Sequence, residues 1–252
     1  MNSVKEKLRP LAEEKDIRRI QARWDELKLK VDETVLKEVY ELIKEDPFSY
    51  LFLTSVILKN IESFSPNVAL ILMAILQKYG GDLTFGLLVD SLIELGKTKP
   101  EESKQIVDHL LRIGSALCDV ASGSLLTGLY LSQKHKILLD YMRSKHPLAQ
   151  RATLRAIIYA TLRRERPVAV KEQMLEILKM EHADPVVVAL LPTALLCISN
   201  NEDTEIIEKA ATIVKENDDA KAFILTCIYH IRHLSPTITI NILKACIESN
   251  DT

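Results

Sequence analysis

Three helix-length segments follow one another between His146 and Asn200 with almost no residues between them, and each opens on a proline. These prolines are Pro147, Pro167 and Pro185. Proline is tolerated in the first turn of a helix, because the amide hydrogen that it lacks has no partner there. The stretch is therefore predicted to form three consecutive helices joined by short loops.

Helix starts of two kinds alternate along the chain after residue 32. Successive starts of the first kind are 32, 35, 33, 34, 35 and 33 residues apart, and those of the second kind are 36, 37, 27, 38 and 34 residues apart. The 27-residue interval indicates a short helix near 136–144. The first series is Glu33, Ser65, Pro100, Gln133, Pro167, Glu202 and Ser235, and the second is Asp46, Asp82, Asp119, His146, Asp184 and Asp218. Such a period is typical of a repeat protein, in which stacked helix hairpins bury a continuous core.

Aspartate opens five of the six segments in the second series. An aspartate at this position can accept hydrogen bonds from the exposed amides of the first helical turn, so five capped helix starts are expected. The loops between neighbouring helices come out at about two to four residues, and links this short place neighbours antiparallel.

Composition supports an all-helical chain. The 252 residues include only seven glycines and nine prolines, and aromatic residues make up 5%. A sheet protein of this length needs more turn residues and more aromatic residues. We therefore predict an all-α fold, a right-handed α-solenoid of about six helix pairs. Residues 1–32 are assigned to N-terminal capping helices, one with an apolar stripe, and residues 33–249 to a single continuous array of repeats. The stripe is Ile17, Ile20, Trp24, Leu27 and Val31.

Local motifs within this array resemble the HEAT-repeat and armadillo-like α-solenoid family. Asp184-Pro185 followed by three valines, His146-Pro147 followed by Gln150-Arg151, and Asp46-Pro47 resemble the start of a HEAT helix. Pro192 matches the proline that bends a HEAT helix, and Asp203 lies near the family's turn aspartate. The resemblance covers roughly residues 33–249 and implies a scaffold or adaptor that holds a partner in a concave surface.

Charge is unevenly spread along the chain. The segment 134–171 holds ten basic and two acidic residues, a net charge of +8, whereas 172–252 carries −7. One interpretation is ordinary helix-end charge, since cations are favoured at a helix C-terminus. The other is an anion-recognition patch, for an acidic protein surface or for phosphates. The candidate patch is Arg143, Lys145, Arg151, Arg155, Arg163, Arg164, Arg166 and Lys171.

Chemical motifs are sparse, and no catalytic residue, metal site or cofactor is predicted. Cys227, His230 and His233 are expected within one helix, where no more than two of them could converge on a metal, whereas structural zinc needs four ligands. Phosphate-cradling glycine loops and hydrolase or zinc-protease motifs are missing from the sequence. The four scattered cysteines favour a reducing compartment. No signal peptide or membrane span is predicted, so the expected location is cytoplasmic, or nuclear in a eukaryote.

The function expected from these features is a non-catalytic scaffold or adaptor that binds a protein partner with an acidic surface. The alternative is a nucleic-acid-binding HEAT-like protein that contacts phosphates. A HEAT-like DNA glycosylase is the enzymatic form of this alternative, and it needs aromatic residues beside a carboxylate. Trp24 already has an apolar role, and the other residues that could serve are Tyr141, Tyr159 and Asp140.

Overall fold

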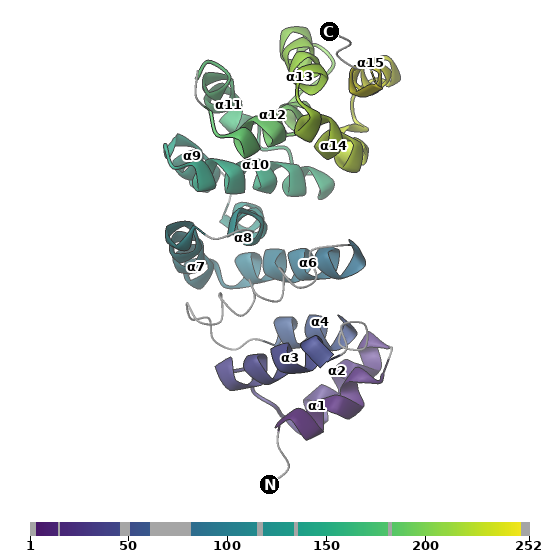
Figure 1. Cartoon of the computed structure of the whole chain (residues 1–252). Helices are drawn as coiled ribbons and strands as arrows, with labels where there is room; N and C mark the ends of the chain where they lie inside the picture. Colours follow the sequence, from purple (N-terminus) through teal and green to yellow (C-terminus); the bar gives the residue numbers. More distant parts are fainter. Residues whose placement is uncertain are drawn as a thin grey trace. The chain divides into compact units, whose positions relative to one another are not determined.

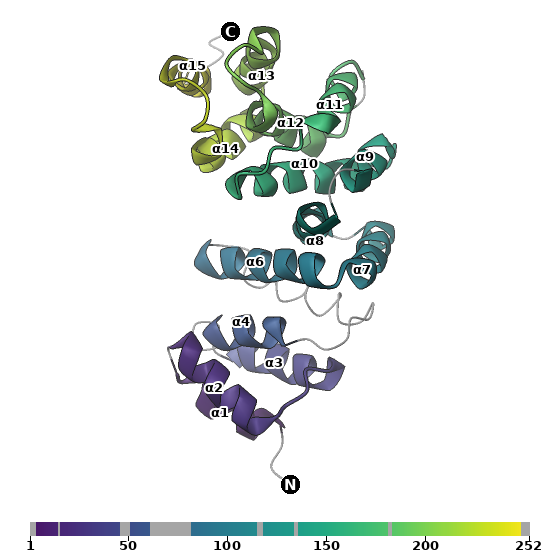
Figure 2. The same ribbon diagram turned by 180° about the vertical axis from the view of Figure 1, so that it is seen from behind.

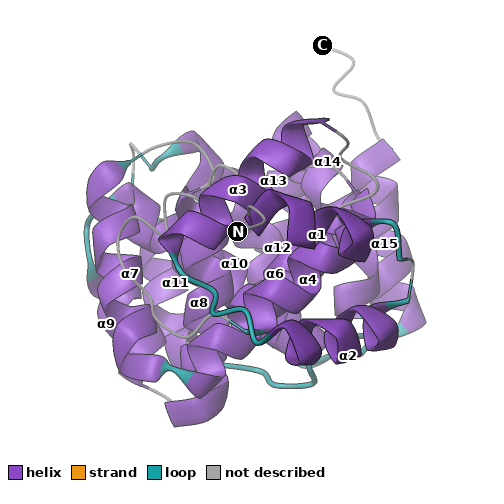
Figure 3. Cartoon of the chain, turned by 90° about the horizontal axis from the view of Figure 1, so that it is seen from below, coloured by secondary structure: helices purple, strands orange, loops and turns teal. Residues whose placement is uncertain are grey.

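The computed structural model describes residues 4–14, 16–45, 51–60, 82–114, 118–133, 136–180 and 183–247. Within these ranges the chain forms fourteen α-helices and two short 3-10 helices, with no β-strand (Figures 1 and 3). The prediction of an all-α fold is confirmed. The chain divides into two compact units, Met1–Gly128 and Leu129–Thr252, and the dividing point falls within helix α8 (Cys118–Gln133).

The first unit is built from six helices and the greater part of α8. Helix α1 packs on α2, α3 and α4; helix α4 packs on α2 and α6; and α6 packs on α7. The six helices are α1 (Val4–Ala12), α2 (Ile17–Leu27), α3 (Glu33–Glu45), α4 (Leu51–Lys59), α6 (Asp82–Thr98) and α7 (Pro100–Ile113). Leu8, Ile20, Leu36 and Leu53 are fully buried between them.

Helix α2 buries part of the predicted apolar stripe. Asp16 caps its start by accepting hydrogen bonds from the amides of Arg18 and Arg19. Ile20 and Trp24 are buried, whereas Leu27 is 39% exposed. The helix ends there because Lys28 takes a left-handed conformation, with φ of 47°. Val31 is also buried, but it lies in the loop after α2 and not in the helix. The apolar stripe of the helix is therefore one turn shorter than predicted.

Helices α6 and α8 cross with their backbones in contact at Gly96 and Gly128. A β-carbon added to Gly128 would lie 2.1 Å from the carbonyl oxygen of Ile93, and one added to Gly96 would lie 2.3 Å from that of Leu125. Real β-carbons do not approach backbone oxygens this closely, so any side chain at either position forces the two helices apart.

The second unit is organised around α12, which packs against α10, α11, α13, α14 and η2 (Figure 2). Every residue from 189 to 199 is buried, which explains why this segment is apolar on all sides. The elements are α9 (Lys136–Arg143), α10 (Pro147–Leu162), η1 (Val168–Val170), α11 (Lys171–Ile177), α12 (Pro185–Ile198), α13 (Thr204–Glu216), α14 (Asp218–Cys227), η2 (Ile228–Ile231) and α15 (Pro236–Ile247).

The predicted helix starts agree with the structure to within a few residues at most of the described positions. Pro147 and Pro185 each occupy the first turn of their helix. Pro167 instead precedes the 3-10 turn η1, and α11 begins four residues later, at Lys171. The short helix predicted near 136–144 is α9. The starts predicted at Asp46 and Ser65 lie outside the described residues.

Two of the predicted aspartate caps can be checked through their hydrogen bonds. Asp184 accepts bonds from the amides of Val186 and Val187, as predicted. The prediction for Asp218 is wrong by one residue, because the side chain of Asn217 accepts the amide of Ala220 at 2.9 Å. Asp218 is the first helical residue and bonds Lys221 instead. Asn217 suits the N-cap because its side-chain oxygen accepts a first-turn amide. Asp218 suits the first turn because negative charge is favoured there.

Two buried threonines in neighbouring helices make a matched stability test. Thr153 in α10 and Thr193 in α12 are both fully buried, but the Thr153 hydroxyl donates to the carbonyl of Ala149, whereas that of Thr193 has no partner. An unsatisfied buried hydroxyl costs free energy that valine, with the same shape, avoids. We expect Thr193→Val to raise and Thr153→Val to lower the free energy of unfolding by about 1 kcal/mol, as measured by urea denaturation. Shifts in the same direction would contradict this assignment.

Candidate partner-binding surface

The basic residues predicted to form a patch lie on α9, α10, α11 and the loops between them. Arg143 ends α9, and Lys145 lies in the loop before α10. Arg151 and Arg155 lie on α10, and Lys171 begins α11. Arg163, Arg164 and Arg166 follow the end of α10 at Leu162.

Arg151 is bound to Asp184 at the start of α12. Its Nε lies 2.8 Å from Oδ1 of Asp184, and its second terminal nitrogen lies 2.5 Å from Oδ2. The Arg151 side chain is 25% exposed and that of Asp184 is 15% exposed. The hydrogen bond from Arg151, aided by the amides of Val186 and Val187, lowers the pKa of Asp184 against the opposing effect of burial. Arg151 therefore fastens α10 to the capped end of α12.

Lys171 and Arg166 bind the region where α12 ends and α13 begins. Nζ of Lys171 lies 2.6 Å from Oδ1 of Asp203, and this bond lowers the pKa of the Asp203 carboxyl. Arg166 donates to the carbonyls of Cys197, Ile198 and Ser199. Helix-end carbonyls have no partner within the helix, so the guanidinium of Arg166 caps α12.

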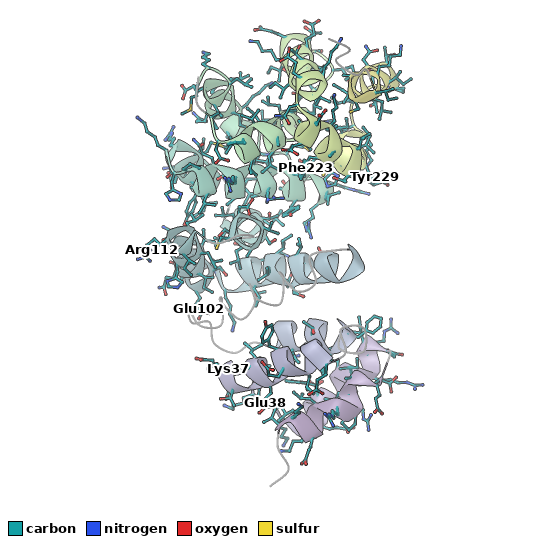
Figure 4. All side chains as sticks on the ribbon, in the orientation of Figure 1. Lys37, Glu38, Glu102, Arg112, Phe223 and Tyr229 are labelled. Atoms are coloured by element: carbon teal, nitrogen blue, oxygen red, sulfur yellow. The ribbon has the colours of Figure 1, made fainter. Side chains whose placement is uncertain are left out.

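Arg155 and Arg163 also make contacts within the unit. The guanidinium of Arg155 lies over the ring of Phe223 on α14, 5.8 Å from its centre, which is within the range of a cation–π contact. Figure 4 labels Phe223 on α14 and Tyr229 just beyond the helix end. Arg163 donates to the carbonyl of Tyr159, one turn back on α10, at 3.0 Å.

Several side-chain contacts between elements of the second unit span a similar number of residues. Arg151 and Asp184 are 33 residues apart, and Lys171 and Asp203 are 32 apart. Arg166 reaches 31 to 33 residues ahead. The ring of His233 contacts the carbonyl of Ser199, and the side chain of Asn201 accepts the amide of Ser235, each across 34 residues. This separation matches the repeat period predicted from the helix starts.

Three of the eight candidate residues are exposed and make none of these contacts within the described parts of the chain: Arg143, Lys145 and Arg164. Arg164 takes a left-handed backbone conformation with φ of 64°, which turns the chain away from α10. The 16 residues of α10 separate Lys145 from Arg164, a length of about 24 Å at 1.5 Å per residue. The structure therefore brings Arg143 and Lys145 together at one end of α10 and places Arg164 at the other.

A groove between α11 and α13 was not predicted from the sequence. It has a volume of about 550 Å³, and its walls are mainly apolar. Leu175, Leu178 and Lys179 line one side, and Glu205, Lys209, Thr212 and Ile213 line the other. The sequence signal for it is weak, because Leu175, Leu178 and Ile213 fall on apolar faces of amphipathic segments and resemble ordinary core residues there.

The segment from Cys227 to His233 does not form one helix, which corrects the prediction made for it. Helix α14 ends at Cys227, His230 lies in the 3-10 turn η2, and His233 lies in the turn that follows. Burial is the main cause that lowers the pKa of both histidines. Among the described residues no three His, Cys, Asp or Glu side chains are grouped so that they could hold a metal ion.

The residues considered for base excision lie on α2, α9 and α10. Trp24 is 3% exposed within the first unit, so its ring is enclosed by core side chains. Asp140 is exposed on α9, Tyr141 on the same helix is half-buried, and Tyr159 is half-buried on α10.

Cys197 is a buried thiol. Burial raises its pKa to about 12, which keeps the thiol protonated at neutral pH.

Comparison of the chain with protein-family models, with curated proteins and with solved structures gives no match. Of the helices in the described residues, none combines the length and the apolar character needed to cross a bilayer.

Proposed function

We propose that this protein is a non-catalytic scaffold, built as a HEAT-like right-handed α-solenoid, that binds a protein partner with an acidic surface. The observation that carries the proposal is the recurring link across 31 to 34 residues in the second unit. Links of this kind are what stacked repeats need, because each repeat contacts mainly its neighbours. A surface made in this way suits binding by shape and charge.

The exposed cations at the start of α10 are the proposed contact for an acidic partner. Arg143 and Lys145 are two residues apart, both are exposed, and their nearest acidic neighbour in the chain is Asp140. Three other cations are less suited to this role because their charges already have partners within the unit. Arg151 binds Asp184, Arg166 binds the end of α12, and Lys171 binds Asp203. The basic segment thus combines internal links with a smaller surface for recognition.

We expect the double change Arg143→Glu and Lys145→Glu to weaken binding to polyglutamate at least about tenfold, a difference of about 1.4 kcal/mol. The reason is that two attractive charges become repulsive at the contact. Fluorescence anisotropy with labelled polyglutamate measures the effect at low and moderate salt. The matched control is Lys104→Glu with Lys244→Glu, two exposed lysines elsewhere on the chain with the same change in net charge.

Two results would contradict this assignment. If the control variant loses binding as much as the Arg143/Lys145 variant, net charge and not a local surface governs the interaction. If duplex DNA of unrelated sequences binds more tightly than polyglutamate, with affinity that falls steeply between about 50 and 200 mM salt, phosphate contacts are responsible. That result favours the nucleic-acid-binding alternative.

A further inference from the structure

The groove between α11 and α13 lies where two helices rest on α12 without filling the space between them. Helix α11 packs on α9 and α12, and α13 packs on α12, α14 and α15. Figures 1 and 2 both show α11 and α13 on the same side of α12. The volume of about 550 Å³ falls within the range of about 300–1,000 Å³ that is usual for ligand-binding pockets.

The apolar walls of the groove are half-exposed, in contrast to the neighbouring core. Met174 and Ile177 on α11 are 0% and 4% exposed, and Val214 on α13 is fully buried. Leu175, Leu178 and Ile213, one residue away from these core positions, are half-buried in the groove. Met180, just beyond the lining, is 49% exposed. An apolar side chain that entered the groove would remove this surface from water.

The charged groups of the groove favour an acidic occupant. Lys179 lies on the α11 side and is exposed, and Lys209 lies on the α13 side with its side chain 53% exposed. Glu205 is the one acidic residue of the lining, and its carboxylate binds Nζ of Lys209 at 2.6 Å. The opposite charges of Glu205 and Lys209 cancel, so Lys179 leaves the groove with a net positive charge. A carboxylate on an occupant would therefore be attracted to the Lys179 side of an apolar groove.

We propose that the α11–α13 groove binds a short acidic peptide segment of a protein partner, which inserts bulky apolar side chains between the two helices and directs a carboxylate to Lys179. This assignment rests on the proposed scaffold function and deepens it by naming a second contact. An apolar anchor with a charged residue beside it is a common arrangement in peptide recognition. The groove supplies affinity through burial, and Lys179 supplies the preference for acidic sequences.

The test is a selection of random 12-residue peptides on phage against the full-length protein. We expect enriched sequences to combine Leu, Ile, Phe or Met with Asp or Glu. Synthetic copies should bind the Lys179→Glu and Thr212→Arg variants at least about tenfold more weakly, a difference of 1.4 kcal/mol. Lys179→Glu reverses the charge, whereas Thr212→Arg places a long side chain in the groove.

The matched controls are Thr226→Arg and Lys244→Glu. Thr212 and Thr226 are both exposed helical threonines whose hydroxyls donate to a carbonyl one turn back, so the two arginine variants perturb folding alike. Both controls should keep the affinity of the unchanged protein. Circular dichroism of each variant checks that it is folded.

The possible failures are distinguishable. Peptides that lose binding in the Arg143/Lys145 variant, but not in the groove variants, would overturn the groove assignment and leave the scaffold function standing. If no peptide is enriched but polyglutamate still binds through Arg143 and Lys145, the groove assignment is wrong and the scaffold function stands. If neither peptide nor polyglutamate binds, both proposals are wrong. A dimer seen by sedimentation equilibrium and abolished by Thr212→Arg would show that a second copy of this chain occupies the groove, which also overturns the peptide assignment.

Discussion

Gly128→Ala is expected to lower the free energy of unfolding of the first unit by about 3 kcal/mol, the upper part of the usual range for overpacking. The added methyl would lie 2.1 Å from the carbonyl oxygen of Ile93 and 2.7 Å from Cα of Gly96, both of them backbone atoms. Backbone atoms cannot turn aside as the end of a long side chain can. Helices α6 and α8 must therefore separate, and the packing on both sides of the crossing is lost. Alanine's better helix propensity, about 1 kcal/mol, offsets part of this cost.

The measurement can be confined to the first unit. Trp24 is the only tryptophan of the chain and is buried on α2, so its fluorescence reports unfolding of this unit in the full-length protein. Urea titration followed by tryptophan emission gives the free energy for each variant.

Gly86→Ala on the same helix α6 provides the control. Nothing lies within 4 Å of a β-carbon added there, and the residue is exposed. This change should leave the unit as stable as before or raise its stability by up to about 1 kcal/mol, through helix propensity. Equal losses of stability at Gly86 and Gly128 would refute the close crossing of α6 and α8.

Asp184→Ala is expected to destabilise the second unit by about 2–3 kcal/mol, because one carboxylate performs two tasks there. Its loss leaves two amides at the start of α12 without their cap, a cost of about 1 kcal/mol. It also leaves the guanidinium of Arg151, 25% exposed, without its bidentate partner. Asp184→Asn should cost about half as much, since asparagine caps a helix equally well and only the charge is lost. Hydrogen exchange of α10 and α12 amides measures both changes within this unit.

The same residue gives the stability of the second unit a pH dependence of known sign. Arg151 lowers the pKa of Asp184 below its ordinary value of 3.8. The stabilisation is therefore complete above that ordinary value and is lost as the pH falls through the lower pKa of the folded protein. Asp184→Ala should make the stability of the unit less dependent on pH below about 4 than in the unchanged protein. An unchanged acid dependence would mean that other carboxylates dominate.

Helix content and many helix boundaries followed from local sequence features. Pro147, Pro185 and Asp184 act within one helical turn, so their effect can be read without knowledge of distant residues. The errors arose where local rules compete. Asn217 caps α14 although Asp218 also satisfies the capping rule, and Cys227 ends α14 because the chain tightens into a 3-10 turn.

The candidate site was harder to predict, because a run of basic residues does not say which of them are free. Arg151, Arg155 and Arg166 belong to the same run as Arg143 and Lys145, but they bind groups on α12 and α14 that are more than thirty residues away. The α11–α13 groove was equally hard to predict, because it depends on where α11 and α13 pack on α12.

The amino-acid sequence by itself determined that the described chain is helical and how closely its helices follow one another, because propensity, capping and apolar periodicity operate over a few residues. Tertiary structure alone decided that Gly96 and Gly128 meet, that Arg151 reaches Asp184 and that Lys179 lies beside an apolar groove. These are contacts between residues distant in sequence, and their energies depend on burial and on distances that exist only once the helices have packed together.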